Sequence, residues 1–590
     1  MTAFEAPVRD ALFVMNEIGN LPSVLEQPAH AETTPELVAT ILEEAGKFAA
    51  GVIAPLNAVG DREGNKWADG VVSTAPGVAS AYKDFVENGW NALGSNPEFG
   101  GQGLPHLVSF AATEFWTGAN MAWSLCSLLT LGAALAVENH ASDDLKSLYL
   151  PKMISGEWTG TMNLTEPQAG SDLAAIRTRA VPEGDVYRIT GTKIFITWGE
   201  HDMAENIVHL VLARLPDAPP GVKGISLFLV PKFLVNPDGS LGERNDLICS
   251  SIEHKLGIHG SPTAVMSYGD KGGAIGYLVG EANRGLEYMF TMMNHARLNV
   301  GLEGVAVSER AYQQARDYAK ERVQGRPIGQ ANGAAIIHHP DIRRMLLDMK
   351  ARIDAMRALS YYVAGQMDLA HGSDAGLAKA AAARVDLLTP VAKGWCTENS
   401  QIVTSIGVQV HGGVGFIEET GAAQHMRDAR ITTIYEGTTG IQANDLVGRK
   451  VARDHGAAAL ALIDEMKSVL PGLDGQLAPL GAGLAEGLAD LERAVGFILS
   501  TNDAEPGVVA AGAVPFLHLF GTVAGGWLVA KLALSARETM AAKGDGDGFL
   551  SSKIVLARHY ARHVLPHARA YLIAATEGAD STLGYDDRHF

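Results

Sequence analysis

The chain has 590 residues, of which 47% are apolar and 7% aromatic, and it carries a net charge of −19. This composition is typical of a folded globular protein, and the length predicts roughly three or four domains. Because an acidic surface repels phosphate backbones, we expect no nucleic-acid binding. An anionic ligand would have to be held by local Arg side chains, backbone N–H groups and helix N-termini.

The three cysteines, Cys126, Cys249 and Cys396, are too widely spaced for a metal motif, and an odd number cannot pair fully. We expect no metal site, and buried thiols in a reducing compartment. The first residues, Met1–Pro7, are acidic and contain no basic or apolar leader. The sequence therefore predicts a cytoplasmic protein.

Hydrophobic periodicity changes twice along the chain. Apolar residues recur at helical spacing in Glu36–Phe48 and Leu107–His140, whereas short alternating runs follow from about residue 158 to residue 282. Helical periodicity then returns from Gly285 to about residue 450 and continues beyond it. We predict an α+β multidomain protein with a helical domain over 1–157, a β-barrel over 158–282, a helical bundle over 283–450 and a C-terminal helical extension over 451–590.

One apolar stretch, Gly507–Ala530, raises the question of membrane contact. It contains Pro515, His518 and five glycines, and Lys531 follows it. We expect a buried helical pair here, with membrane contact as the alternative that is not favoured.

The strongest motif lies in the run from Gln409 to Gln442. Glycines in Gln409–Phe416 allow a backbone to lie close against a flat or phosphorylated ligand. Downstream, Glu436 stands between Tyr435 and the pair Gly437-Thr438, where a lone carboxylate could be a general base beside a cofactor. Any one of the 66 acidic residues, taken without such a motif, is far more often a surface charge.

A second motif, Met162–Asp172, opens the β region with the hydroxyls of Thr165 and Ser171 and with Gly170 for close backbone approach. These groups suit the polar edge of a flavin ring and a pyrophosphate. Ser171-Asp172 could equally be a helix cap. Further along, Lys193–Thr197 reads as a plain strand.

These motifs, in this order, resemble those of the acyl-CoA dehydrogenases, and the resemblance covers about residues 35–450. It implies a C-terminal four-helix bundle, bound FAD, and Glu436 as the base that removes the α-proton of an acyl-CoA. The β-hydride passes to flavin N5 in that family, which gives a trans-2-enoyl-CoA. Phe195 replaces a common Trp, and Asn294 replaces an Asp.

The resemblance assigns individual residues to the two ligands. Those assigned to FAD are Met162, Leu164, Thr165, Gly170, Ser171, Phe195, Thr197, Arg322, Gln324, Gln409, Gly412, Gly413, Gly437 and Thr438. Those assigned to the acyl-CoA are Ser171, Asn294, Arg297 and Tyr435. The long C-terminus looks most like the 3-(methylthio)propionyl-CoA dehydrogenase branch, so we expect that thioester or a short to medium acyl-CoA as substrate.

The resemblance also implies partners and leaves rivals open. In the family, Arg322 and Gln324 match a motif whose Arg reaches the FAD pyrophosphate of a neighbouring subunit, so we expect at least a homodimer, with an electron-transferring flavoprotein as electron acceptor. An acyl-CoA oxidase would share the fold and the base. A nitroalkane oxidase would use Asp as its base, and a non-catalytic helical interaction protein would bind no FAD.

Overall fold

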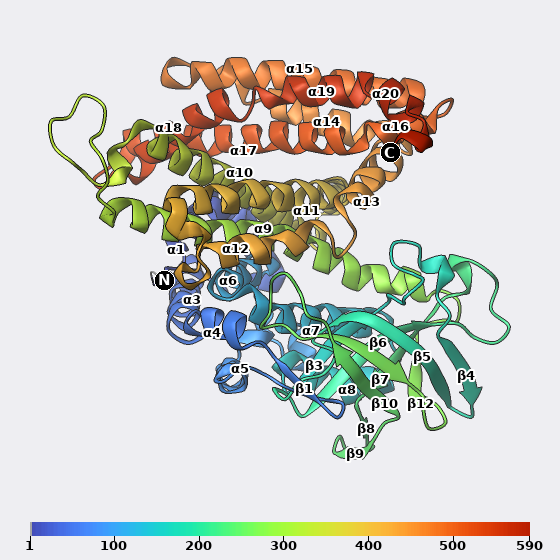
Figure 1. Ribbon diagram of the computed structural model, residues 1–590. Helices are drawn as coiled ribbons and strands as arrows, with labels where there is room; N and C mark the ends of the chain where they lie inside the picture. Colours follow the sequence, from blue (N-terminus) through green and yellow to red (C-terminus); the bar gives the residue numbers. More distant parts are fainter. Residues whose placement is uncertain (1–2) are drawn as a thin grey trace. The chain divides into compact units, whose positions relative to one another are not determined.

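The computed structural model describes residues 3–590 and divides them into two compact units (Figure 1). Unit 1 combines the chain up to Glu43 with Pro105–Glu114 and Arg297–Phe590. Unit 2 consists of Glu44–Leu104 and Phe115–Ala296. The predicted order of helical, β and helical segments is confirmed, whereas the four domain boundaries stay a prediction because the contacts define two discontinuous units.

In the N-terminal part, helices are interrupted by one short hairpin. The helices are α1 (Val8–Glu17), α2 (Leu21–Leu25), α3 (Pro35–Phe48), α4 (Pro55–Glu63), α5 (Val78–Glu87), α6 (His106–Ala119), α7 (Met121–His140) and α8 (Asp143–Ser155), with strands β1 (Lys66–Ala68) and β2 (Val71–Ser73) between α4 and α5. The stretch Leu107–His140 is not continuous, because Asn120 adopts an extended backbone and its side chain caps α7 by accepting from the Trp123 N–H at 3.1 Å.

Unit 2 is built on an eight-stranded sheet, whose main path runs β10-β11-β5-β12-β7-β6-β3, with β4 paired to β5. The strands are β3 (Trp158–Asn163), β4 (Arg179–Glu183), β5 (Val186–Thr197), β6 (Asn206–Ala213), β7 (Ser226–Pro231), β10 (Leu247–Ile252), β11 (Thr263–Tyr268) and β12 (Ala274–Val279); a separate hairpin joins β8 (Phe233–Val235) and β9 (Leu241–Arg244). The predicted β-barrel is confirmed in part. Within residues 3–590 no pairing joins the outer strands β10 and β3, so the sheet is an open half-barrel.

Both faces of the central strands are covered. Leu210 of β6 and Leu229 of β7 belong to a core shared with α7 and α8, whereas their neighbours Val211 and Phe228 belong to a second core. This follows from the two-residue period of a strand, and it explains why β6 is buried along its whole length. At the edge strand β3, Gly160 donates its N–H to the Thr130 hydroxyl of α7 at 3.0 Å.

Unit 1 is helical. Its elements after residue 297 are the rest of α9 (Gly285–Glu321), α10 (Pro340–Ala370), α11 (Ala375–His411), α12 (Ala422–Ala429), α13 (Thr439–Asn444), the π-helical turn η11 (Asp445–Ala452), α14 (Ala457–Lys467), α15 (Ala478–Thr501), α16 (Pro506–Ala511), α17 (Ala513–Lys543), α18 (Phe549–His563), α19 (His567–Glu577) and α20 (Ala579–Gly584). In the C-terminal extension α15, α17 and α19 lie side by side (Figure 1).

The extension packs on the rest of unit 1 through α17, which contacts α10, α11 and α13. Glycines make the approach close, since a Cβ at Gly521 would lie 2.2 Å from Cγ of Trp395 in α11. The predicted helical pair over Gly507–Ala530 is α16 followed by the much longer α17. Two helices of the described chain, α7 and α17, are long and apolar enough to cross a membrane by length and composition, but 83% of the most apolar window of each is buried inside the protein.

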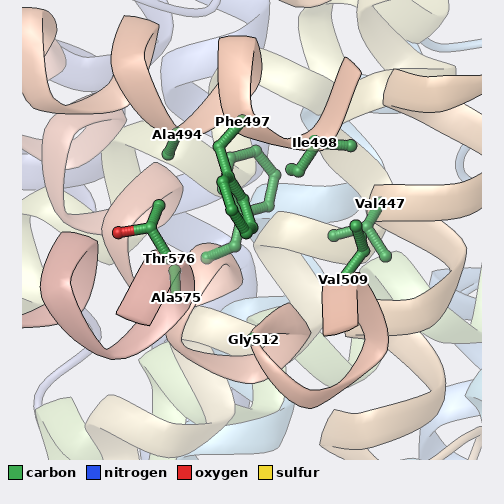
Figure 2. A pocket seen from close by; sticks show the side chains of 9 residues that line it. Val447, Ala494, Phe497, Ile498, Val509, Gly512, Ala575 and Thr576 are labelled. Atoms are coloured by element: carbon green, nitrogen blue, oxygen red, sulfur yellow. The ribbon is translucent and has the colours of Figure 1, made fainter. Parts of the chain in front are cut away.

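A small apolar cavity of about 10 Å³ lies between the extension and η11 (Figure 2). Val447 of η11 and Phe497, Ile498 and Val509 of the extension surround it (Figure 2). Its lining is apolar except for Thr576, whose hydroxyl already donates to the Leu572 carbonyl at 2.9 Å, so the cavity is a small packing defect and not a ligand site.

Candidate functional site

Glu436 sits on a strained turn that leads into α13. Its φ is +54° and that of Gly437 is +88°, so two successive residues are in the left-handed region. For a residue with a side chain this conformation costs of order 1 kcal/mol and persists only where neighbours hold it. Gln442 is one such neighbour, because its side-chain amide donates to the carbonyl oxygens of Glu436 at 3.1 Å and Gly437 at 3.3 Å.

The predicted cofactor residue Thr438 has a structural task on this turn. Its hydroxyl caps α13 by accepting from the Ile441 N–H at 3.3 Å. The helix therefore begins at Thr439, three residues after Glu436, and its N-cap is a Thr side chain that is visible in the sequence.

Two helices bring further ionisable groups beneath the turn. Gly301 and Gly304 of α9 face the backbone of α11, and a Cβ at Gly304 would lie 2.8 Å from the carbonyl oxygen of Cys396. This close approach places Glu303 of α9 and Lys393 of α11 in the same buried region, with 1% and 0% of each residue exposed. Lys393 donates from Nζ to the Gly437 carbonyl oxygen at 2.7 Å, and the Tyr435 hydroxyl donates to Glu303 Oε2.

Burial dominates the electrostatics of this cluster. It raises the pKa of Glu436 to about 7, although the positive charges of Arg297 and Lys393 work in the opposite direction. It also raises the pKa of Glu303 to about 8 and lowers the pKa of Lys393 to about 8. The arrangement therefore gives Glu436 the proton affinity that a general base needs near neutral pH.

Arg297 and Tyr435, both predicted to contact the acyl-CoA, belong to this buried cluster. Arg297 is 5% exposed and forms an ion pair with Asp445 of η11, with 3.6 Å between Nη1 and Oδ2. The other oxygen of Asp445 lies 2.7 Å from Nε of Arg449. The positive charge of Arg297 acts on Glu436 and favours the ionised form of its carboxyl group. Asn294, the third predicted contact, is exposed and lies in unit 2.

In unit 2 the predicted flavin residues form one group around β5. The Thr165 carbonyl accepts from the Ile194 N–H at 2.9 Å, so the segment after β3 lies alongside the end of β5. Phe195 has a φ of +60° and is 59% exposed. The register of β5 against β11 places Ile194 and Phe195 opposite the single residue Val265, which is a β-bulge. The bulge turns an aromatic ring outward at a backbone cost, as is common at ligand sites.

A buried ion pair secures the same segment. Lys193 donates to Glu166 Oε1 at 2.8 Å and to the Leu164 carbonyl at 3.0 Å. Glu166 also accepts from the N–H groups of Arg177 and Thr178. Burial opposes its ionisation, but these partners outweigh burial and lower the pKa of Glu166 to about 2. The two charges of the ion pair balance each other, so the pair adds no net charge beside the predicted flavin residues.

The groups that remain around the bulge fit an isoalloxazine ring. Phe195 offers a flat apolar face, and the partly buried Thr165 and Thr197 offer uncharged hydroxyls. A Cβ at Gly170 would meet nothing within 4 Å, and Ser171 beside it is exposed, so this backbone is open to a ligand. Met162 lies on β3 and is partly buried, as is expected below a ring.

The remaining predicted FAD residues form an exposed group at one end of unit 1. Arg322 follows α9, and its Nη2 donates to the Gln324 side chain at 3.1 Å. The ring of Tyr318 in α9 stacks on that of His411 in α11 with centroids 4.5 Å apart, which brings the two helix ends together. Gln409, Gly412 and Gly413 at the end of α11 are exposed, and a Cβ at either glycine would meet nothing within 4 Å.

The motif analysis missed Glu303, Lys393, Gln442 and the pair Glu166–Lys193. A signal existed for the first two, since each is a charged residue inside an apolar helical run, and a buried charge requires a partner.

Comparison with known proteins agrees with this organisation. Four family models match in chain order: the acyl-CoA dehydrogenase N-terminal domain over residues 36–157, its middle domain over 161–270, its C-terminal domain over 283–451, and an acetyl-CoA dehydrogenase C-terminal-like domain over 461–586.

Individual relatives span nearly the whole chain. The chain is 48% identical to 3-methylmercaptopropionyl-CoA dehydrogenase of Ruegeria pomeroyi over 591 residues, which covers 98% of this chain and 99% of that one. It is 36% identical to a butyryl-CoA dehydrogenase of Syntrophomonas wolfei, covering 90% and 91% of the two chains. Among solved structures, an acyl-CoA dehydrogenase from Bacillus anthracis complexed with FAD shares the fold with a TM-score of 0.75 at 20% identity, covering 99% and 94%. The chain therefore belongs to the acyl-CoA dehydrogenase family.

Proposed function

We propose that Glu436 is the base with which this protein removes the α-proton of a short acyl-CoA, with 3-(methylthio)propionyl-CoA as the first candidate substrate. The chain is an FAD-dependent acyl-CoA dehydrogenase. The assignment of Glu436 rests on its position on a left-handed turn and on its pKa. Burial raises the pKa of its carboxyl group to about 7, although the charges of Arg297 and Lys393 act in the opposite direction.

The chemistry requires such a base. The α-proton of a thioester is too weakly acidic for a carboxylate of ordinary pKa, so burial must raise the proton affinity of the base. Bound FAD supplies the acceptor for the β-hydride. The Glu436 backbone N–H is the protein donor that we propose for the thioester oxygen, where negative charge develops as the proton leaves.

We also propose that the residues of unit 2 around Phe195 hold the flavin ring. The uncharged hydroxyls, the exposed aromatic face and the open backbone at Gly170 support this assignment. Met162, Leu164, Thr165, Ser171 and Thr197 complete it. The exposed group Arg322, Gln324, Gln409, Gly412 and Gly413 suits a phosphate or adenine portion, because a guanidinium matches phosphate oxygens and glycines admit close contact.

The choice of substrate rests on the relatives. The Ruegeria pomeroyi relative is named for a thioether acyl group and the Syntrophomonas wolfei relative for a four-carbon acyl group. Both acyl groups are short, and the higher identity to the first favours the thioether.

Several further assignments are proposals that accompany this function. They are the four domains 1–157, 158–282, 283–450 and 451–590, a four-helix bundle within the third, a homodimer, an electron-transferring flavoprotein as acceptor, and a cytoplasmic location. The spans of the four family models support the domain assignment, since their boundaries fall close to these positions.

An anaerobic titration tests the function. The purified protein is mixed with 3-(methylthio)propionyl-CoA, butyryl-CoA and octanoyl-CoA, and flavin absorbance is followed. We expect bleaching by the short thioesters, and in Glu436→Gln a rate about 10²–10⁴-fold lower with FAD still bound. Glu418→Gln, which removes an exposed carboxylate of the same segment, is the control and should bleach normally. Normal bleaching in Glu436→Gln would remove Glu436 from the role, and peroxide formation in air at the turnover rate would indicate an oxidase.

A further inference from the structure

We propose that Lys393 is a positioning residue for the reaction: its ammonium group holds the Gly437 carbonyl, and with it the left-handed turn that aims the Glu436 carboxyl. This inference rests on the proposed function, in which Glu436 is the base. Lys393 lies on α11, 43 positions before Glu436, and no motif of the chain singles it out.

The turn is held from both sides by ionisable groups. On the side of Gly437, Lys393 Nζ lies 2.7 Å from the carbonyl oxygen. On the other side the Tyr435 hydroxyl donates to Glu303, whose second oxygen has no hydrogen-bond partner among residues 3–590. The peptide of Glu436 is therefore fixed between a buried cation and a buried acid, each on a different helix.

A neutral donor already serves the Gly437 carbonyl. The side-chain amide of Gln442 lies 3.3 Å from the same oxygen, so an ammonium group is not needed merely to satisfy it. Taking a lysine wholly out of water is costly unless its charge is used. What Lys393 adds to the hydrogen bond is a positive charge one residue away from the base.

The charge of Lys393 interacts with four other ionisable groups. Lys393 is approached by the acids Glu303, Glu398 and Glu436 and by the cation Arg297. Glu436 is approached by Arg297 and Lys393, both of which favour its ionised form, while Arg297 is partly neutralised by Asp445. The charge of Lys393 thus favours the ionised form of Glu436 against the effect of burial, and its hydrogen bond holds the turn in place.

Packing of the extension fixes the position of Lys393. Gly394 and Trp395, the next two residues of α11, are pressed by α17, since a Cβ at Gly394 would lie 2.7 Å from Cδ1 of Leu517. The backbone of α11 at Gly394 therefore packs closely against Leu517, which limits movement of α11 toward α17. Lys393 therefore reaches the turn from a rigid support.

The test compares three variants by their pH profiles. Lys393→Met removes both donor and charge at constant length, Lys393→Gln keeps a donor without charge, and Lys350→Met removes another buried lysine of unit 1, which pairs with Asp10 and Glu309. For each we would measure FAD retention, kcat, KM and the pH dependence of flavin bleaching by butyryl-CoA.

For Lys393→Met we expect bound FAD, kcat lower by about 10- to 100-fold, KM within about threefold, and an acidic limb about one pH unit higher, because an opposite charge within reach shifts a carboxyl by roughly that much. Lys393→Gln should recover kcat in part but keep the shifted limb. Lys350→Met should melt at a lower temperature with the limb unmoved.

An unmoved limb in Lys393→Met overturns the inference, and so does an equal shift in Lys350→Met. Lys393→Gln decides the same point if the methionine variant does not fold. Glu436→Gln, measured in the same assay, distinguishes a failure of the proposed function from a failure of the inference about Lys393. If that variant bleaches normally, the proposed function fails; if it does not bleach while the lysine variants keep the wild-type limb, only the role of Lys393 fails.

Discussion

The reaction of the free enzyme with an acyl-CoA should slow as the pH falls below 7 and approach a tenfold loss per pH unit below pH 6, because it requires ionised Glu436. Burial raises the pKa of this carboxyl from its ordinary 4.5 to about 7. The perturbation is a change of pH alone, so no side chain of the protein is replaced.

The magnitude follows from the two pKa values. With a pKa of about 7, roughly a tenth of Glu436 is ionised at pH 6 and about nine tenths at pH 8, which predicts a tenfold difference. With the ordinary value, Glu436 would be almost fully ionised at both, and the rate would hardly change. The pKa values of about 8 for Glu303 and Lys393 place their own titrations at the upper edge of this window, so the part of the profile below pH 7 reports Glu436.

The assay is kcat/KM for flavin bleaching between pH 5.5 and pH 9, since this ratio reports the groups of the free enzyme and free substrate. The 3′-phosphate of CoA is a confounding group, because the second pKa of a phosphate monoester is about 6. A dephospho-CoA thioester lacks that group and should give the same acidic limb. A limb near 4.5 with both thioesters would refute the argument that burial tunes Glu436.

Three substitutions test other parts of the structure. Glu166→Gln leaves Lys193 charged and buried, so we expect unit 2 to lose about 3–5 kcal/mol in thermal unfolding and the double variant Glu166→Gln/Lys193→Met to recover most of it; equal losses in both would contradict a compensated pair. Phe195→Gly relieves a left-handed φ, so the apoprotein should melt at no lower temperature. The same change removes the flat ring, so FAD, titrated by fluorescence, should bind more weakly. An unchanged affinity for FAD would exclude Phe195 from the flavin face. Gly521→Ala forces a Cβ to within 2.2 Å of a buried indole and should cost about 1–3 kcal/mol in denaturant unfolding, whereas Gly496→Ala, which meets nothing within 4 Å, should cost nothing.

Much of the fold was predictable because the relevant signal is local. A period of two residues marks the strands of 158–282, and a period near 3.6 marks the helices on either side. How far the sheet closes could not be predicted, because it depends on whether β10 and β3 meet, and no residue within either strand specifies that pairing. The break at Asn120 did have a local signal, an Asn that caps a helix, but it lies inside an otherwise continuous apolar run.

The residues of the candidate site also differ in whether their signal is local in the sequence. Glu436 stood out because a glycine-rich run and an aromatic residue surround it in sequence. Glu303 and Lys393 did not, because they become neighbours only through Gly301 and Gly304, which let two long helices touch. The left-handed φ of Phe195 could not be predicted from the sequence either, since it follows from the register of β5 against β11.

One buried contact of unit 1 ties the two ends of the chain together. Lys553 of α18 pairs with Asp10 of α1 and, at 2.7 Å, with Asp354 of α10, and Lys350 also reaches Asp10 at 3.1 Å. Asp10 is synthesised early, and Lys553, the cation that completes the cluster, follows 543 residues later. During synthesis Lys350 becomes available to Asp10 first, but the complete cluster forms only after Lys553 has left the ribosome. We therefore expect unit 1 to mature only after translation ends, while unit 2, complete by Ala296, has everything it needs to fold during synthesis.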